Sequence, residues 1–97
     1  MSTNIQERRT LQEARTTASP ADVLAAAKRF FTSNNAIYSA FVERQGPTFV
    51  GFRGQGGEEL LISAIPRDGS TLVTGSSYLF DQQIARFFAT LPAPESR

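Results

Sequence analysis

The chain has 97 residues, and its ten basic and nine acidic side chains give a formal net charge of +1. A chain of this length forms one domain, and its near-neutral charge argues against the broad basic surface that phosphate-backbone binding needs. Because the sequence contains neither cysteine nor histidine, disulfides, Cys/His zinc sites, and Ser-His or Cys-His catalysis are excluded.

The first 18 residues are rich in Thr, Gln, Arg and Glu, with few sizeable apolar side chains beyond Ile5 and Leu11. Such a segment cannot bury enough apolar surface to offset the entropy lost when it becomes ordered. We therefore predict a flexible N-terminal tail over residues 1–18 and a short C-terminal tail over residues 93–97. A functional arm that folds against a partner is the alternative for the N-terminal segment.

A helix is predicted directly after this tail. Ser19 is a favourable N-cap, Pro20 suits the first turn, and Asp22 lies near the positive end of the helix dipole. Residues 33–35, Ser-Asn-Asn, end the helix because asparagine tolerates the left-handed conformation common at helix ends. The apolar residues follow the spacing of one buried helical stripe. They are Val23, Ala27, Phe30 and Phe31.

Four strand-like runs follow, separated by segments that contain the turn residues glycine and proline. The runs are 37–44, 48–53, 59–65 and 71–76, and the separators are 45–47, 54–57 and 66–70. Short separators of this kind predict consecutive hairpins, and therefore an antiparallel meander. A second helix with a buried stripe is predicted to close the domain. Its apolar residues are Phe80, Ile84, Phe87, Phe88 and Leu91.

This order of elements predicts an α+β fold, a two-layer sandwich over residues 19–92. In it a four-stranded antiparallel meander is flanked by an N-terminal and a C-terminal helix, α-β-β-β-β-α. Two helices cover only one face of the sheet, yet both sets of alternating strand positions carry apolar side chains. One set is Tyr38, Val42, Val50 and Phe52, and the other is Ile37, Phe41 and Phe49. The pattern leaves open which set faces the helices, and the other face should meet a second subunit, a partner or a ligand.

Two motifs that suggest chemistry have simpler explanations. The glycine-rich residues 54–57 lack the Lys-Ser/Thr pair and the following helix of a phosphate-binding loop, so we interpret them as a hairpin loop. Glu58 and Glu59 are adjacent, and on a strand they would face opposite sides, so they cannot form an acid/base pair. We therefore expect no catalytic, cofactor-binding or metal-binding residues, and a chain that is not an enzyme.

The sequence resembles short bacterial proteins of unknown function that have a TATA-binding-protein-like or helix-grip-like layout. The segments that carry the resemblance are 23–31, 49–53, 71–75 and 84–91, and it extends over about residues 20–92. It implies the fold and no catalytic residue. Helix-grip proteins with a long cavity usually have an extra first strand and a long C-terminal helix. The four strands and short helix predicted here argue against a ligand tunnel.

We therefore expect a non-enzymatic binding or assembly module that acts through the uncovered sheet face and forms a homodimer. The candidate interface or ligand face is Tyr38, Val42, Val50 and Phe52. A hetero-partner would be the other occupant of that face. No apolar run approaches the roughly 20 residues of a membrane span, and we expect a cytoplasmic protein.

Two other functions remain open from the sequence. The first is binding of a small apolar, lipid-like ligand in a cavity between the sheet and the helix side chains. Those side chains are Phe30, Phe31, Ile84, Phe87 and Phe88. The second is binding of single-stranded nucleic acid through stacked aromatic rings and an arginine-containing tail. The residues for it are Tyr38, Phe41, Phe49, Phe52, Arg44, Arg53, Arg8, Arg9 and Arg15.

Overall fold

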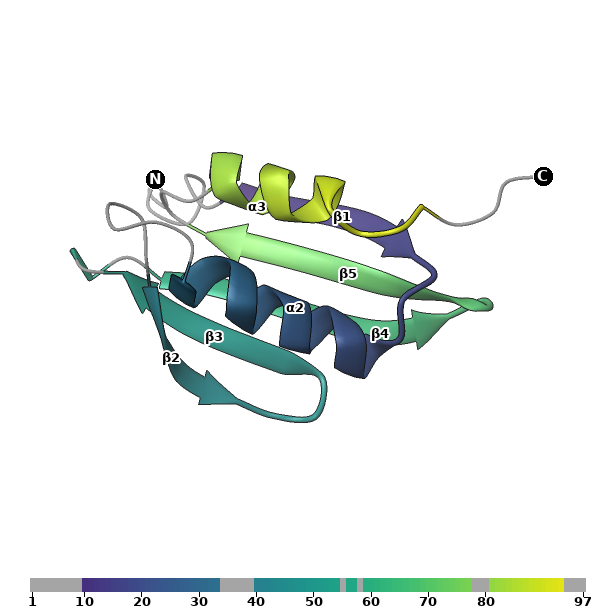
Figure 1. Cartoon of the computed structure of the whole chain (residues 1–97), viewed down its shortest axis with the longest axis horizontal. Coiled ribbons are helices and arrows are strands. Elements are labelled where there is room, and N and C mark those ends of the chain that lie inside the picture. Colours follow the sequence, from purple (N-terminus) through teal and green to yellow (C-terminus); the bar gives the residue numbers. More distant parts are fainter. Residues whose placement is uncertain (1–9, 34–39, 55, 58, 78–80, 94–97) are drawn as a thin grey trace, which may run out of the picture.

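The computed structural model describes residues 10–33, 40–54, 56–57, 59–77 and 81–93 (Figure 1). Within these ranges the chain forms five strands and two helices in the order β-α-β-β-β-β-α. The elements are β1 (Thr10–Thr16), α2 (Pro20–Ser33), β2 (Ala40–Gln45), β3 (Phe49–Gly54), β4 (Glu59–Arg67), β5 (Ser70–Ser77) and α3 (Asp81–Ala89). The strands form one antiparallel sheet in the order β1-β5-β4-β3-β2.

The sheet therefore has five strands, and the prediction of a four-stranded meander is wrong, although the fold is α+β. The additional strand, β1, lies inside the segment predicted to be a tail and pairs with β5 from Thr10 opposite Ser77 to Thr16 opposite Thr71. An edge strand is held largely by backbone hydrogen bonds, which do not depend on side-chain polarity. Counting apolar residues therefore missed it. Residues 1–9 and 94–97 of the two predicted tails lie outside the described residues.

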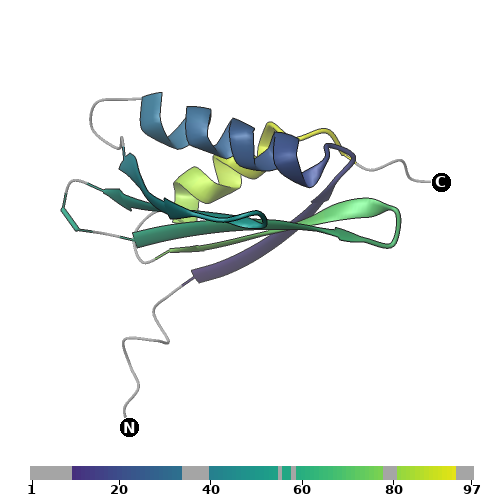
Figure 2. The same ribbon diagram turned by 90° about the horizontal axis from the view of Figure 1, so that it is seen from below.

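Both helices lie across the same face of the sheet, as Figure 2 shows. Helix α2 packs mainly over β4, β2 and β3, whereas α3 packs over β1 and β5. The start of α2 agrees with the sequence, because Ser19 Oγ accepts a hydrogen bond of 3.1 Å from the backbone N–H of Asp22. Pro20 is the first helical residue. In the described part of the chain, no helix or strand covers the opposite face of the sheet.

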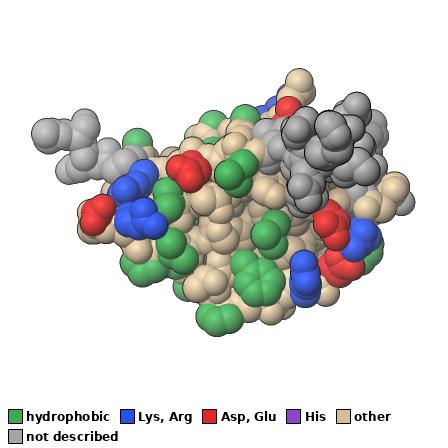
Figure 3. Space-filling view, turned by 180° about the vertical axis from the view of Figure 1, so that it is seen from behind, with side chains coloured by type: hydrophobic (Ala, Val, Ile, Leu, Met, Phe, Trp, Pro, Cys, Tyr) green, Lys and Arg blue, Asp and Glu red, His purple; other side chains and the backbone are tan. Residues whose placement is uncertain are grey.

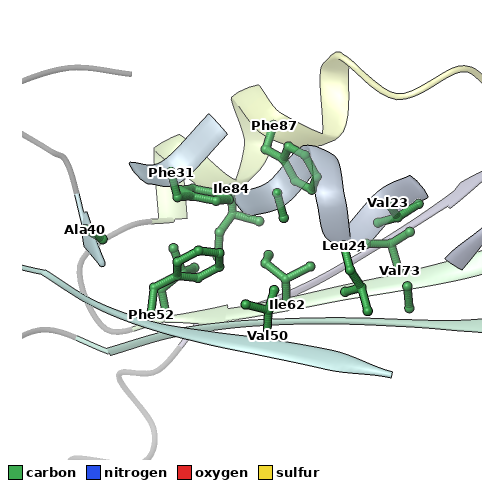
Figure 4. Close-up of a cluster of buried hydrophobic side chains, with 13 residues drawn as sticks. Val23, Leu24, Phe31, Ala40, Val50, Phe52, Ile62, Val73, Ile84 and Phe87 are labelled. Atoms are coloured by element: carbon green, nitrogen blue, oxygen red, sulfur yellow. The ribbon is translucent and has the colours of Figure 1, made fainter. Parts of the chain in front are cut away.

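The core lies between the helices and the sheet, and its buried phenylalanine rings are Phe31, Phe52 and Phe87 (Figure 4). The Phe31 ring on α2 lies 5.3 Å from that of Phe52 on β3 and 5.5 Å from that of Phe87 on α3. Phe30 completes the cluster, 4.9 Å from Phe31 and 5.5 Å from Phe87. Aromatic rings at these spacings contribute to packing beyond the area that they bury. One cluster therefore joins both helices to the sheet.

Helix α3 approaches β5 closely at Gly75. A Cβ atom at this position would lie 2.8 Å from Ile84 Cγ2 and 3.3 Å from Ile62 Cδ1. Ile84 and Ile62 are both completely buried, so neither can move aside without disturbing its neighbours. The missing side chain at Gly75 is what allows Ile84 to pack directly on the strand.

We predict that Phe87→Ala lowers the free energy of unfolding by about 3–5 kcal/mol, since a buried aromatic ring is removed from a packed core. Phe87 is 1% exposed. Urea denaturation followed by circular dichroism measures the change. The matched control is Phe88→Ala on the same helix, where the ring is only half-buried and the expected loss is smaller by at least about 1 kcal/mol. Equal losses would contradict this placement of the two rings.

We predict that Gly75→Ala costs about 1–3 kcal/mol through overpacking against Ile84. Gly51→Ala on β3 is the control, because its Cβ would meet Arg44 Cγ at 3.5 Å and Leu61 Cδ1 at 3.6 Å, which are ordinary contacts. Thermal unfolding of the two variants provides the comparison. A Gly75→Ala protein as stable as Gly51→Ala would show that α3 does not rest on β5 as described.

A third prediction concerns β1, whose removal should abolish cooperative folding. A chain that begins at residue 17 leaves β5 as an unpaired edge and removes the hydrogen bond from Thr16 Oγ1 to the Pro92 carbonyl, 2.6 Å long. It also removes one of the two strands beneath α3. Amide dispersion in a nitrogen–proton NMR spectrum tests this. A well-dispersed spectrum with an unchanged melting temperature would mean that β1 is dispensable.

Candidate functional site: the uncovered sheet face

The face of the sheet opposite the helices, here called the uncovered face, carries apolar side chains from all five strands. Leu11 on β1 and Phe41 on β2 are 68% and 55% exposed. The other apolar side chains on this face are half-buried; they are Phe49, Leu61, Ile65 and Leu72. Figure 3 shows hydrophobic side chains across the middle of this face and charged ones toward its two ends. Large exposed apolar side chains concentrated on one face indicate an interaction surface.

The described members of the two residue sets of the sequence analysis lie on opposite faces. Val50 and Phe52 are each 1% exposed and are part of the core beneath the helices. Val42 packs against this core and is half-buried, whereas Tyr38 lies outside the described residues. Phe41 and Phe49, from the other set, lie on the uncovered face, and Ile37 is outside the described residues. The candidate surface is therefore formed by the second set.

Several residues of this face were not predicted from the sequence. Leu11, Glu13 and Arg15 reach it because β1 is a strand, and they alternate with residues that face the helices. Leu61 and Ile65 on β4 also lie on this face, opposite in alternation to the buried Leu60, Ile62 and Ala64. The spacing of Leu11, Glu13 and Arg15 was the available signal for β1, but two of the three side chains are charged. A search for apolar alternation does not detect such a strand.

An ion-pair network lies at one end of the uncovered face. Arg53 on β3 contacts Glu43 Oε2 on β2 at 2.9 Å and Glu59 Oε2 on β4 at 3.1 Å. It also donates a hydrogen bond of 3.0 Å to the Gly57 carbonyl. The hydrogen bond with Glu43, together with the charges of both carboxylates, raises the pKa of Arg53 above its ordinary value. This arginine is therefore neutralised by its neighbours and poorly suited to bind a phosphate.

The opposite end of the face also combines charges of both signs. Arg15 Nη2 lies 3.8 Å from Asp68 Oδ2 in the tight β4–β5 hairpin. Its Nη1 donates hydrogen bonds to the carbonyl of Arg67 at 3.0 Å and to Ser70 Oγ at 2.9 Å. A hollow of about 350 Å³ lies here, lined by Glu13, Ala14, Arg15, Arg67 and Leu72. It lacks the single sign of charge that would select an ionic ligand.

A smaller hollow of about 50 Å³ lies on β3, lined in part by Arg44, Gly51 and Leu61. It forms where Gly51 presents no side chain. Sites that hold drug-sized ligands are roughly 300–1,000 Å³, so this hollow is too small to bind one. Among the described residues no group of three Asp or Glu side chains could hold a metal ion.

The structure also places the residues of the two alternative functions. The ring cluster of Phe30, Phe31 and Phe87, with Ile84 completely buried beside it, occupies the space proposed for an apolar ligand. For nucleic acid, the proposed stacking rings are divided between the faces, with Phe41 exposed and Phe52 in the core. Arg8 and Arg9 lie outside the described residues. Binding of either ligand remains a prediction from the sequence.

Comparison with known proteins gives one fold similarity. No protein-family model and no curated protein sequence matches the chain. Among solved structures, the Aha1 dimer from Colwellia psychrerythraea, determined in solution, is similar with a TM-score of 0.65 and 12% sequence identity. The similarity covers 84% of this chain and 91% of that chain. At this identity it shows a shared α+β fold, with which the helix-grip-like and TATA-binding-protein-like layouts are compatible. No described helix is long and apolar enough to cross a membrane.

Proposed function

We propose that the chain is a non-enzymatic binding or assembly module that forms a homodimer through the uncovered face. The observation that carries the proposal is the position of Leu11 and Phe41, both more than half exposed, around the half-buried Phe49, Leu61 and Ile65. In the described part of the chain, no helix or strand covers these side chains. Burying them against a second copy would remove this apolar surface from water.

The size of the face is sufficient for a weak specific interface. Five strands spaced about 4.8 Å apart and about 20 Å long give a face of roughly 24 Å by 20 Å. Two such faces in contact would bury on the order of 1,000 Å² in total, the lower limit for a specific interface. Dissociation of the dimer should therefore be measurable at micromolar concentrations.

The charge of the face supports a second copy as its occupant. Arg15, Arg44, Arg53 and Arg67 are balanced by carboxylates on the same face and its hairpin. The acidic residues are Glu13, Glu43, Glu59 and Asp68. A face without net charge does not repel its own copy, whereas a strongly charged one would. The solved structure of similar fold is itself a dimer, and two-fold dimers are the commonest protein assembly.

We predict that Phe41→Arg gives a folded monomer. The ring is 55% exposed, so its replacement leaves the core intact but places an unpaired charge in the proposed interface. Sedimentation velocity over about 1–100 μM measures the mass, since a dimer of this size should dissociate in the micromolar range. Phe52→Arg, by contrast, should unfold the chain, because that ring is 1% exposed beneath the helices.

Ala25→Arg is the matched control for Phe41→Arg. Ala25 is exposed on α2, on the other side of the molecule, and arginine is a good helix former. This variant adds the same side chain and should remain dimeric. If the unchanged protein is a monomer at every concentration, or if Phe41→Arg and Ala25→Arg dimerise equally, then the proposal of a dimer through this face is wrong.

A further inference from the structure

Three charged side chains on the uncovered face have no ion-pair partner among the described residues. They are Glu13, Arg44 and Arg67. Glu13 lies on β1 and Arg44 on β2, which are the two edge strands of the sheet. Arg67 lies beside the hairpin at the end of the more central β4. Within the described ranges, each edge strand thus carries one charged side chain without an ion pair, negative on β1 and positive on β2.

Glu13 and Arg44 lie on opposite edges of the sheet but at nearly the same height along the strand direction. Glu13 pairs with Thr74, which pairs with Ser63 and then Phe49, whereas Arg44 pairs with Gly51. Phe49 and Gly51 are neighbours on the same face of β3. The two charges are therefore offset by one step along the face, about 7 Å. That offset is within the combined reach of a glutamate and an arginine side chain.

A two-fold dimer through this face has two main arrangements. In the first, the two-fold axis runs parallel to the central strand β4, and β1 of each subunit lies over β2 of its partner. We call this the exchanged-edge orientation. Each Glu13 then lies over the edge that carries Arg44 of the other copy, and the symmetry forms this contact twice. In the second, the axis runs perpendicular to the strands. β1 of one subunit then lies over β1 of the other, and each Glu13 faces the β1 edge of the partner subunit. Like charges brought together in this way weaken an interface.

We infer that the homodimer adopts the exchanged-edge orientation, in which β1 of each subunit lies over β2 of its partner. Two symmetry-related ion pairs between Glu13 of one subunit and Arg44 of the other hold this orientation. The inference rests on the proposed function, because it assumes that the uncovered faces meet. It assigns different tasks to the two kinds of side chain. The apolar side chains provide the buried area, and the edge charges select one orientation of the two sheets.

A charge-exchange experiment tests the arrangement. Glu13→Arg and Arg44→Glu, made separately, each place like charges at both contacts, and each should raise the dimer dissociation constant roughly tenfold or more. The double variant restores opposite charges in the reversed order. It should return the dissociation constant to within about threefold of the unchanged protein, as expected for residues that interact directly. Sedimentation equilibrium at two salt concentrations measures all four proteins, and the differences should shrink at the higher salt.

Arg86→Glu is the matched control for Arg44→Glu. Arg86 is exposed on α3, on the helix side of the molecule, and its reversal changes the net charge by the same amount. It should leave the dissociation constant unchanged. Circular dichroism of each variant establishes that it is folded before its assembly is compared.

The outcomes separate the inference from the proposed function. If Phe41→Arg dissociates the dimer but neither single reversal changes its affinity, the face is the interface and the exchanged-edge orientation is wrong. If both reversals weaken the dimer and the double variant is weaker still, the two side chains do not meet and the inference is overturned. An effect of Glu13→Arg alone also overturns it, because Arg44 then takes no part in the contact. A monomeric unchanged protein overturns both proposals.

Discussion

The structure depends on the contact between Phe31 and the rings around it. Phe31 lies on α2, and its neighbours Phe87 and Phe52 lie on α3 and β3, at 5.5 Å and 5.3 Å. This cluster holds both helices against the same face of the sheet. Isolated helices shorter than about 12–15 residues are marginal in water; α3 has 9 residues and α2 has 14, at that limit. Their stability therefore comes from the apolar side chains that they bury together on the sheet.

The second requirement is that β1 completes the sheet beneath α3. Its polar side chains join parts of the chain that are distant in sequence. Gln12 Nε2 donates a hydrogen bond to the Asp81 carbonyl at the start of α3, and Thr16 Oγ1 donates one to the Pro92 carbonyl beyond its end. Both ends of α3 are thus held to the same edge strand. A segment that is too polar to form a core by itself positions the helix that completes the core.

Covering one face of the sheet leaves the other with a distinct chemistry. Its apolar side chains lie between two groups of charges, and in both groups the arginines are partly neutralised within the chain. Arg53 contacts two carboxylates and Arg15 lies near one. Such a face suits an apolar protein surface better than a phosphate backbone, which requires net positive charge. Glu13 and Arg44, which have no ion-pair partner among the described residues, lie on the two edge strands, where we propose that they orient the dimer.

The two helices and the strands β2–β5 could be predicted from the sequence because their signals are local, although the sheet has a fifth strand. The cap at Ser19, the helical spacing of apolar residues in α2 and α3, and the Asp68-Gly69 turn each depend on neighbouring residues only. Both turn residues have positive φ, 54° and 83°. Pro66 was assigned to the turn segment 66–70, yet β4 continues to Arg67. The ladder between β3 and β4 ends where Phe49, the first residue of β3, pairs with Ser63. No β3 residue therefore lies opposite Pro66 to require its N–H.

Only the tertiary structure decided three further points. The first is β1, whose hydrogen bonds come from β5, a strand more than 50 residues away in the sequence. The second is which alternation set faces the helices, because Phe49 and Phe52 are equally apolar and only packing places Phe52 in the core. The third is the pairing of charges, where Arg53 meets Glu43 and Glu59 across three strands. Local residue patterns determine the two helices and strands β2–β5, whereas contacts between distant segments determine β1 and which face of the sheet the helices cover.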